Sequence, residues 1–382
     1  MRIYASCVFI VGWLLFVPGG PQAEDAAAEA GPKQAQFDRL FAEWKEILAE
    51  LWQLRLDYRN ASLGKQGDLD ARYTEVVAQG EKLRPALRAA AEAAYREAPD
   101  GSLFPPEYLM GVVYESCISD SMEEAFSVAK LLIDGGYDNK TLYGWAGVAA
   151  FGVNEFELAE KWLRRAKDNN VPAKLGSPWL ELCELTLRSC PFYRKAWKKE
   201  QALRVAEAKA NQSPKTWLPR VLLRTTKGDI EMELFENEAP NTVKNFIWLV
   251  EQGAYNGKWF GRVIDHYGAE AGAGNPRYAI RCECYQPNYR LNLRGCITMA
   301  LPDDGRDQGS SQFYLLFLPK HLMDGKNTCF GRIVKGMDVL SRLQRVTPKQ
   351  FDEIQPDAII EAKVLRKRDH PYEPEKIPLP KP

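Results

Sequence analysis

WFGRVI, at residues 259–264, is the stretch from which the fold of this chain is predicted. Two further stretches follow it, SSQFY at 310–314 and LMDGKN at 322–327, and FGR at 330–332 comes directly after them. Any one of these would be weak evidence for a fold. Their order and spacing within one half of the chain are specific.

The chain around these stretches changes from a helical to a strand periodicity at Arg220. Ile230, Met232 and Leu234 alternate with acidic residues, which predicts a strand with one buried and one solvated face. Other elements follow from the same reasoning: a strand at 221–226 joined through Lys227-Gly228, a helix between Pro240 and Gly253, a helix at 337–343 and a closing strand at 358–365. Short strands with only two helices are consistent with a closed β-barrel.

In this order and at these intervals, the stretches resemble the cyclophilin-type peptidyl-prolyl cis–trans isomerases over residues 219–368. The resemblance implies a closed barrel capped by two helices, an enzyme without cofactor or metal, and proline-containing polypeptides as substrates. Such an enzyme rotates an amide bond over a barrier of about 18–20 kcal/mol. It needs a donor for the prolyl nitrogen and an apolar slot for the proline ring.

Arg262 matches the catalytic arginine of this family, and a guanidinium suits the role because it stays charged and presents its N–H groups in one plane. The alternative is a surface arginine engaged in an ion pair. The positions that match the family's substrate-binding residues are Tyr267, Glu270, Ala300, Leu301, Gln312, Tyr314, Leu322, Met323 and Asn327.

The chain departs from the family pattern at several of these positions. Gly261 replaces a His, Leu301 an Asn, Leu322 a Trp and Asn327 a His. Gly268 replaces a Met, which predicts a wider slot. Glu270 replaces a Gln, and its carboxylate is expected to pair with Arg262 and to slow the enzyme. The rival hypotheses are a proline-peptide binding module with little or no catalysis, and a purely structural barrel.

Residues 35–212 are expected to be helical. Phe37, Phe41, Trp44, Leu48, Leu51 and Tyr58 recur on one helical face, and a second helix is predicted from an N-cap at Asp68, with Pro85 as a kink or break. Small and large residues at 105–172, among them Gly111, Gly147 and Leu163, resemble tetratricopeptide repeats, whose period is about 34 residues. The alternative is an unrelated helical bundle. The repeats would serve as a platform for a protein partner or for self-association.

Two more helices are predicted at 179–188 and 192–211, before a breaker at 211–214. The second is rich in Arg and Lys and also carries Glu200 and Glu207, and we interpret this charge run as a solvated face. Lys+Arg and Asp+Glu both number 51, so the formal net charge of +0 gives no electrostatic case for a nucleic-acid partner. At 382 residues, two domains are expected.

Residues 1–23 have the form of a secretory signal: Arg2, about 15 apolar residues, and Ala23 after a Pro-Gly stretch. An uncleaved anchor is the alternative, although a membrane span needs about 20 apolar residues. We therefore expect an exported protein, periplasmic or extracellular, without a stable membrane span. Residues 24–34 are interpreted as a disordered leader, and residues 369–382 as a proline-rich, largely unfolded tail.

Eight cysteines are present, and Cys7 lies in the predicted signal. Export permits disulfides, but their pairing cannot be read from sequence. Cys282 and Cys284 are predicted to point to one face of a strand, with Cys296 near in sequence. No histidine stands beside them at zinc spacing, so buried thiols are the preferred interpretation over a metal site.

Overall fold

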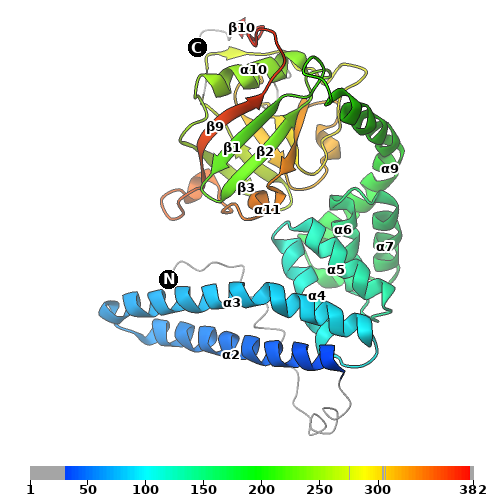
Figure 1. The fold of residues 1–382 in the computed structure, drawn as a ribbon, viewed down its shortest axis with the longest axis vertical. Helices are drawn as coiled ribbons and strands as arrows, with labels where there is room; N and C mark the ends of the chain where they lie inside the picture. The colour runs from blue at the N-terminus through cyan, green and yellow to red at the C-terminus, as the bar shows by residue number, and fades with distance from the viewer. Residues whose placement is uncertain (1–30, 275, 303–304, 306, 379–382) are drawn as a thin grey trace. The chain divides into compact units, whose positions relative to one another are not determined.

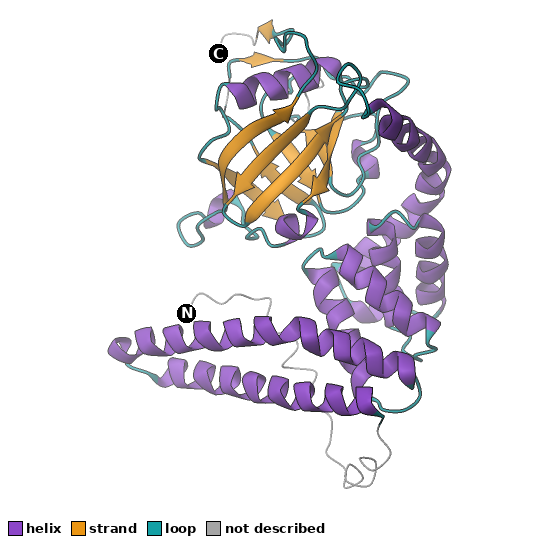
Figure 2. Cartoon of the chain, in the orientation of Figure 1, coloured by secondary structure: helices purple, strands orange, loops and turns teal. Residues whose placement is uncertain are grey.

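The computed structural model describes residues 31–274, 276–302, 305 and 307–378, in which helices precede strands (Figures 1 and 2). The chain divides into two compact units. The first holds the described residues up to Cys117 together with Glu124–Ala146, and the second holds Ile118–Glu123 and the chain from Gly147 onward. The predicted signal peptide and most of the predicted leader lie outside the described residues.

The first unit is built around two long helices, α2 (Pro32–Asn60) and α3 (Leu63–Glu97). The predicted stripe of α2 is buried at Phe37, Phe41, Trp44, Leu48 and Leu51. It packs on α3: Ile47, Leu51 and Leu54 of α2 form one core cluster with Tyr73 and Val76 of α3.

The predicted N-cap of α3 is wrong, and the break that was one of two outcomes predicted at Pro85 does not occur. The helix begins at Leu63, so Asp68 is an interior residue and not its N-cap. The helix also passes through Pro85 without a break. A proline inside a helix costs about 3 kcal/mol. Burial of Val76 before it and Leu87 after it anchors both halves and offsets this cost.

The middle of the chain forms the helices expected of two helix pairs: α4 (Phe104–Ile118), α5 (Met122–Asp134), α6 (Leu142–Gly152) and α7 (Phe156–Asp168). Gly147 lies against α7, since a Cβ atom there would come within 2.5 Å of Leu163 Cγ. This is the close approach that the small residue was expected to permit. The tetratricopeptide-like character of these helices stays a prediction.

A short helix α8 (Val171–Leu175) leads into α9 (Trp179–Ala210). The two helices predicted here are one, because α9 continues through Pro191 and ends just before the predicted breaker. Buried Cys183, Cys190 and Tyr193 hold the helix on both sides of the proline. None of the helices in the described residues is long and apolar enough to cross a membrane.

The second unit contains a closed barrel of eight strands in the order β1-β2-β8-β6-β7-β4-β3-β9 (Figure 1). Its strands are β1 (Arg220–Thr225), β2 (Gly228–Leu234), β3 (Lys258–Ile264), β4 (Gly268–Ala271), β6 (Cys296–Met299), β7 (Phe313–Leu316), β8 (Cys329–Lys335) and β9 (Ala358–Arg366). Helices α10 (Pro240–Glu251) and α11 (Met337–Ser341) and the short helices η3 (His321–Met323) and η4 (Pro348–Gln350) lie between them in sequence. Ile230, Met232 and Leu234 are buried, as their alternation predicted, within one continuous core.

The segment after β9 is ordered as far as it is described, in contrast to the unfolded tail that was expected. Tyr372 is buried and donates a hydrogen bond of 2.9 Å to Glu236. His370 contacts the same carboxylate at 2.6 Å. Further on, β10 (Ile377–Pro378) pairs with β5 (Tyr278–Ala279). Proline content predicted an extended backbone correctly but did not reveal these side-chain anchors.

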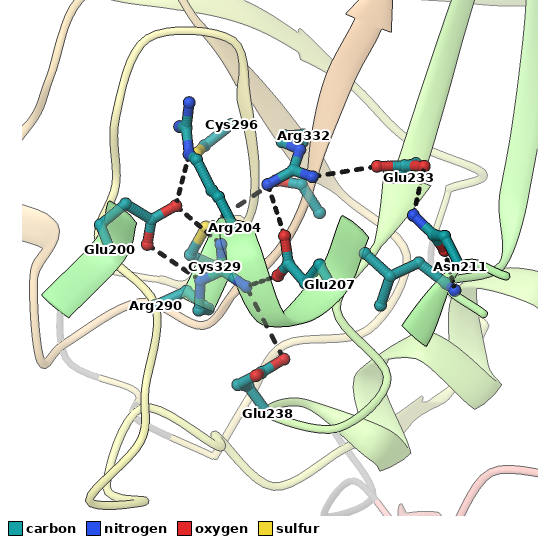
Figure 3. Close-up of polar contacts among 12 residues, drawn as sticks. Glu200, Arg204, Glu207, Asn211, Glu233, Glu238, Arg290, Cys296, Cys329 and Arg332 are labelled. Atoms are coloured by element: carbon teal, nitrogen blue, oxygen red, sulfur yellow. Dashed lines mark hydrogen bonds and ion pairs between the residues drawn. The ribbon is translucent and has the colours of Figure 1, made fainter. Parts of the chain in front are cut away.

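Helix α9 is joined to the barrel by a buried cluster of charged residues (Figure 3). Arg290 donates to Glu200 at 2.7 and 3.1 Å and to Glu207, while its guanidinium lies 3.7 Å from the Phe235 ring centroid. Glu207 also accepts from Arg332 at 2.7 Å. The prediction of a solvated face is therefore wrong for Glu200 and Glu207, which are buried.

These contacts explain why the boundary between the two compact units does not lie at residues 212–219. There the sequence changes from a helical to a strand pattern, and a domain boundary was predicted. Burial disfavours ionised Glu200, but Arg290 and Arg204 outweigh it and leave the pKa of Glu200 below its ordinary value. The pKa of Glu233, on β2, is likewise lowered against the cost of burial by Arg220 and Arg332. Both of these carboxylates are therefore ionised at neutral pH, and α9 belongs to the barrel unit.

Candidate active site

Three neighbouring strands place the predicted catalytic residue beside two predicted binding residues. Arg262 on β3 lies opposite Glu270 on β4, and Glu270 lies opposite Tyr314 on β7. Side chains directly opposite each other in a sheet point to the same face. The next residues along these strands, Val263, Ala269 and Leu315, belong to the core, so the row of Arg262, Glu270 and Tyr314 faces outward.

Arg262 and Glu270 form the predicted ion pair, with 2.9 Å between Arg262 Nη2 and Glu270 Oε2. The Arg262 side chain is 48% exposed, whereas that of Glu270 is 13% exposed. The two atoms are close but not aligned as a hydrogen bond, and Oε2 has no hydrogen-bond partner among the described residues. The guanidinium is thus held by one carboxylate and keeps most of its N–H groups for another partner.

Two tyrosines provide the aromatic part of this face. The rings of Tyr267 and Tyr314 meet edge to face, with centroids 5.6 Å apart. Burial and the neighbouring Glu270 carboxylate raise the pKa of Tyr314 to about 12. Tyr314 is therefore a neutral phenol at physiological pH, beside the positive charge of Arg262.

Lys320 is a neighbour of this face that no sequence pattern pointed to. Its ammonium lies 4.8 Å from the Tyr267 ring centroid, in cation–π geometry. Burial lowers the pKa of Lys320 to about 8, partly opposed by the charge of Asp120. No motif marks a lone lysine after a strand, so only the fold could identify it.

The remaining predicted binding residues differ in their exposure to solvent. Ala300 and Met323 are buried, Gln312 is exposed, and Leu322 on η3 is 69% exposed. Two of these segments are tied together, since the amide of Ala300 donates to the Gln312 carbonyl at 2.9 Å.

Leu301 lies in the loop after β6, and Asn327 lies in the loop before β8. The Asn327 side-chain amide donates to the Met299 carbonyl at 3.1 Å. Leu301 packs near Gly309, where an added Cβ atom would come within 3.2 Å of Leu301 Cδ2. Both loops are therefore connected to the end of β6 at Met299.

Gly268 does not widen the site in the way that was predicted. A Cβ atom at Gly268 would lie 2.6 Å from the carbonyl oxygen of Leu315. The backbone of β7 thus occupies the space next to this glycine. The absence of a side chain allows two strands to approach, and it leaves no opening.

Residues outside the barrel but in the same unit support the loops beside the site, which the sequence also did not reveal. Asp120 is fully buried and accepts from the backbone and ring nitrogens of His266, at 3.1 and 2.8 Å. Tyr193 on α9 donates to Asp324 at 2.8 Å. His266 precedes Tyr267, and Asp324 follows Met323, so each support acts one residue away from the site.

No group of three or more potential metal ligands occurs within the part of the chain that the structure describes. The seven cysteines there are buried thiols. Cys282 and Cys284 do point the same way, but they lie in a loop after β5 and not in a strand.

The barrel and this outward row of Arg262, Glu270 and Tyr314 are those expected of a cyclophilin-type isomerase. Comparison with known proteins agrees with this class. The family model described as cyclophilin type peptidyl-prolyl cis-trans isomerase/CLD matches residues 220–364. A peptidyl-prolyl cis-trans isomerase of Helicobacter pylori (strain ATCC 700392 / 26695) is 40% identical over 132 residues, which are 32% of this chain and 78% of the relative.

A second relative gives the same result. A peptidyl-prolyl cis-trans isomerase-like 1 of Neurospora crassa is 32% identical over 156 residues, 39% of this chain and 96% of the relative. A crystal structure of a cyclophilin from Hirschia baltica is 22% identical, with a TM-score of 0.35, and the match covers 40% of this chain and 75% of that one. The chain belongs to the cyclophilin-type peptidyl-prolyl cis–trans isomerase family, and the barrel is its isomerase domain.

Proposed function

We propose that the chain is an exported peptidyl-prolyl isomerase in which Arg262 is the catalytic residue and acts on X–Pro bonds of folding proteins. The observation that carries this proposal is the outward row on β3, β4 and β7, which places an accessible guanidinium beside an aromatic pair. Family membership supports the reaction type.

The proposed reaction needs no bond to break. As the amide twists, the prolyl nitrogen becomes pyramidal and gains a lone pair that can accept a hydrogen bond. Arg262 is 48% exposed and remains charged, so it can donate to this nitrogen. Interactions that are stronger in the twisted state accelerate the step, about tenfold for each 1.4 kcal/mol.

The rings of Tyr267 and Tyr314 would hold the proline ring, with Met323 as an apolar neighbour. Gln312, exposed on the same side of β7, would bind the substrate backbone. Ala300, Leu301, Leu322 and Asn327 would contact the residues that flank the proline. These roles come from their match to the family, together with the positions described above.

Glu270 is expected to make this enzyme slower than a relative with glutamine at that position. Its carboxylate lies 2.9 Å from the guanidinium and offsets the positive charge that the prolyl nitrogen needs. The same ion pair orients the guanidinium, so the carboxylate has two opposed effects. We propose that the partial neutralisation of the Arg262 charge, which slows the reaction, is larger than the gain from its orientation.

Export and docking are further parts of the proposal. The sequence of residues 1–23 supports export, to the periplasm or the cell exterior. The helix pairs α4–α5 and α6–α7 would provide a docking or self-association platform, as tetratricopeptide-like repeats do. A cell fractionation with the full-length chain tests the first point, and sedimentation of the purified protein tests self-association.

The isomerase proposal is tested by measuring cis–trans exchange of a proline peptide with the parent chain and with Arg262→Ala. The variant should lose at least about tenfold in kcat/KM. The matched control is Arg224→Ala on β1, another half-exposed arginine in an ion pair with a glutamate, which should keep the parent rate. Peptide binding without exchange in the parent would indicate a binding module and contradict the proposal.

A further inference from the structure

Cys282 and Cys284 form a pair of thiols whose sulfur atoms are 2.8 Å apart. They lie in the loop after β5, and both are buried, with 9% and 4% of their surface exposed. The next residue, Tyr285, is 52% exposed. The pair therefore lies just below the surface, one residue from an open turn that a small molecule can reach.

Both thiols point to the turn that carries the predicted binding residue Asn327. Cys282 Sγ lies 3.4 Å and Cys284 Sγ 3.3 Å from the carbonyl oxygen of Lys326. Cys282 Sγ is also 3.3 Å from Thr328 Oγ1. Lys326 and Thr328 flank Asn327, so the two thiols support the turn on which Asn327 stands.

The backbone around the thiols ties the same turn to neighbouring loops. The amide of Glu283 donates to Thr328 Oγ1 at 2.9 Å, and the amide of Met299 donates to the Thr328 carbonyl at 2.9 Å. The amide of Cys282 donates to Asp307 at 2.8 Å. A change in the position of the two thiols would therefore shift the turn at 326–328 and the loop before Gly309.

We propose that Cys282 and Cys284 are a redox-active dithiol, which forms an intramolecular disulfide with a small disulfide such as oxidised glutathione and thereby weakens substrate binding at the isomerase site. The effect on substrate rests on the function proposed above; formation of the disulfide does not.

The reaction is a pair of thiol–disulfide exchanges. One thiolate attacks a sulfur of oxidised glutathione, forms a mixed disulfide and releases one glutathione thiolate. The second thiolate attacks the protein sulfur of that mixed disulfide and releases the second glutathione. The two cysteines lose two electrons and two protons, and the two glutathione molecules gain them.

Oxidation changes the site because a disulfide has no S–H group. The Lys326 carbonyl is then left without a thiol donor, and the sulfurs must also move to a bonding distance of about 2.05 Å. A single hydrogen bond commonly changes an equilibrium several-fold. Since the turn carries Asn327 and not Arg262, the change should appear mainly in KM.

The experiment treats the full chain with reduced or with oxidised glutathione and then blocks remaining thiols with an alkylating reagent. Mass spectrometry should find a peptide with a disulfide between Cys282 and Cys284 in the oxidised sample only. Exchange of a proline peptide should then show a KM about three- to tenfold higher than in the reduced sample, with kcat less affected.

Two variants identify the responsible residues. Cys284→Ser removes the partner thiol and keeps a hydroxyl donor, so it should abolish the response to oxidised glutathione. Cys183→Ala, on α9, removes a buried thiol elsewhere and should leave the response intact. If Cys284→Ser fails to fold, the disulfide map of the parent still tests the proposal.

The outcomes separate this proposal from the proposed function. Absence of the Cys282–Cys284 disulfide, or an oxidised parent with unchanged KM, overturns the redox proposal while isomerase activity stands. If neither form has isomerase activity, the proposed function fails, and the affinity for the proline peptide is compared instead. Equal or undetectable binding by the two forms then overturns the redox proposal as well.

Discussion

Arg290 and Arg262 are both arginines paired with glutamate in the barrel unit, yet their surroundings are opposite. Arg290 has no exposed side-chain surface and contacts Glu200 and Glu207, with Glu238 3.9 Å away. Arg262 is 48% exposed, and Glu270 is its one ion-pair partner among the described residues. Burial with several partners makes an arginine a structural connection, whereas exposure with one partner leaves donors available to a substrate.

The largest expected effect is on the buried side of this comparison. Arg290→Ala should destabilise the barrel unit by about 3–5 kcal/mol, because it leaves Glu200 and Glu207 buried without their main partner. Calorimetric unfolding should show the transition of this unit lowered by roughly 6–20 °C. The control Arg188→Ala removes an exposed pair with Glu184 and should change stability by less than about 0.5 kcal/mol. Equal effects of the two variants would refute the structural role of Arg290.

The next effect concerns Lys320, a half-buried cation for which the described residues provide no ion-pair partner. Its folded pKa of about 8 lies below the ordinary value of 10.5, so the unfolded chain binds more protons between these pH values. Stability should therefore rise from pH 8 to 10.5. Lys320→Met should stabilise the chain by about 1–3 kcal/mol at pH 7 and remove this rise.

Urea unfolding at several pH values measures the Lys320 effect. Lys349→Met, at an exposed lysine, is the matched control and should keep the pH dependence of the parent. A parent whose stability is flat or falls from pH 8 to 10.5, while Lys349→Met behaves in the same way, would contradict the inferred burial of the ammonium.

A smaller effect is expected at the exposed pair. Glu270→Gln should raise kcat/KM for a proline peptide about two- to fivefold, since the guanidinium is no longer offset by a carboxylate. The control is Glu361→Gln, whose carboxylate pairs with Arg224 at 2.8 Å away from the site. An unchanged or lower rate in Glu270→Gln would mean that orientation of Arg262 outweighs attenuation.

The smallest expected effect is that of the exposed arginine on stability. Arg262→Ala should change the free energy of unfolding by less than about 1 kcal/mol, because an exposed ion pair contributes little. Urea unfolding under the conditions used for Arg290→Ala provides this value. A loss as large as that of Arg290→Ala would show that Arg262 also holds the barrel together.

The two arginines also show how far the sequence alone could lead. Arg262 lies within a recognisable stretch, and the family resemblance, which puts Glu270 where a Gln bonds the arginine, predicted their ion pair. The partners of Arg290 are 83 and 90 positions away on α9, and nothing local in the sequence links them. Charged residues on a helix are usually solvated, so Glu200 and Glu207 gave no sign of their burial.

The other differences between the sequence predictions and the structure have similar physical causes. Pro85 and Pro191 lie inside continuous helices because packing on both sides outweighs the local cost of a proline. Gly268 accommodates the backbone of β7, which only the strand pairing reveals. Lys320 and the thiol pair lie in loops near the site, and hydrophobic periodicity does not predict the path of a loop.

The central claim, that Arg262 catalyses proline isomerisation, is tested most directly by the exchange rate of one proline peptide with equal amounts of the parent, Arg262→Ala and Arg262→Lys. We expect measurable exchange with the parent and a loss of at least about tenfold in kcat/KM with Arg262→Ala. Arg262→Lys should recover little, since an ammonium lacks the planar set of donors. A parent rate retained by Arg262→Ala would contradict the account.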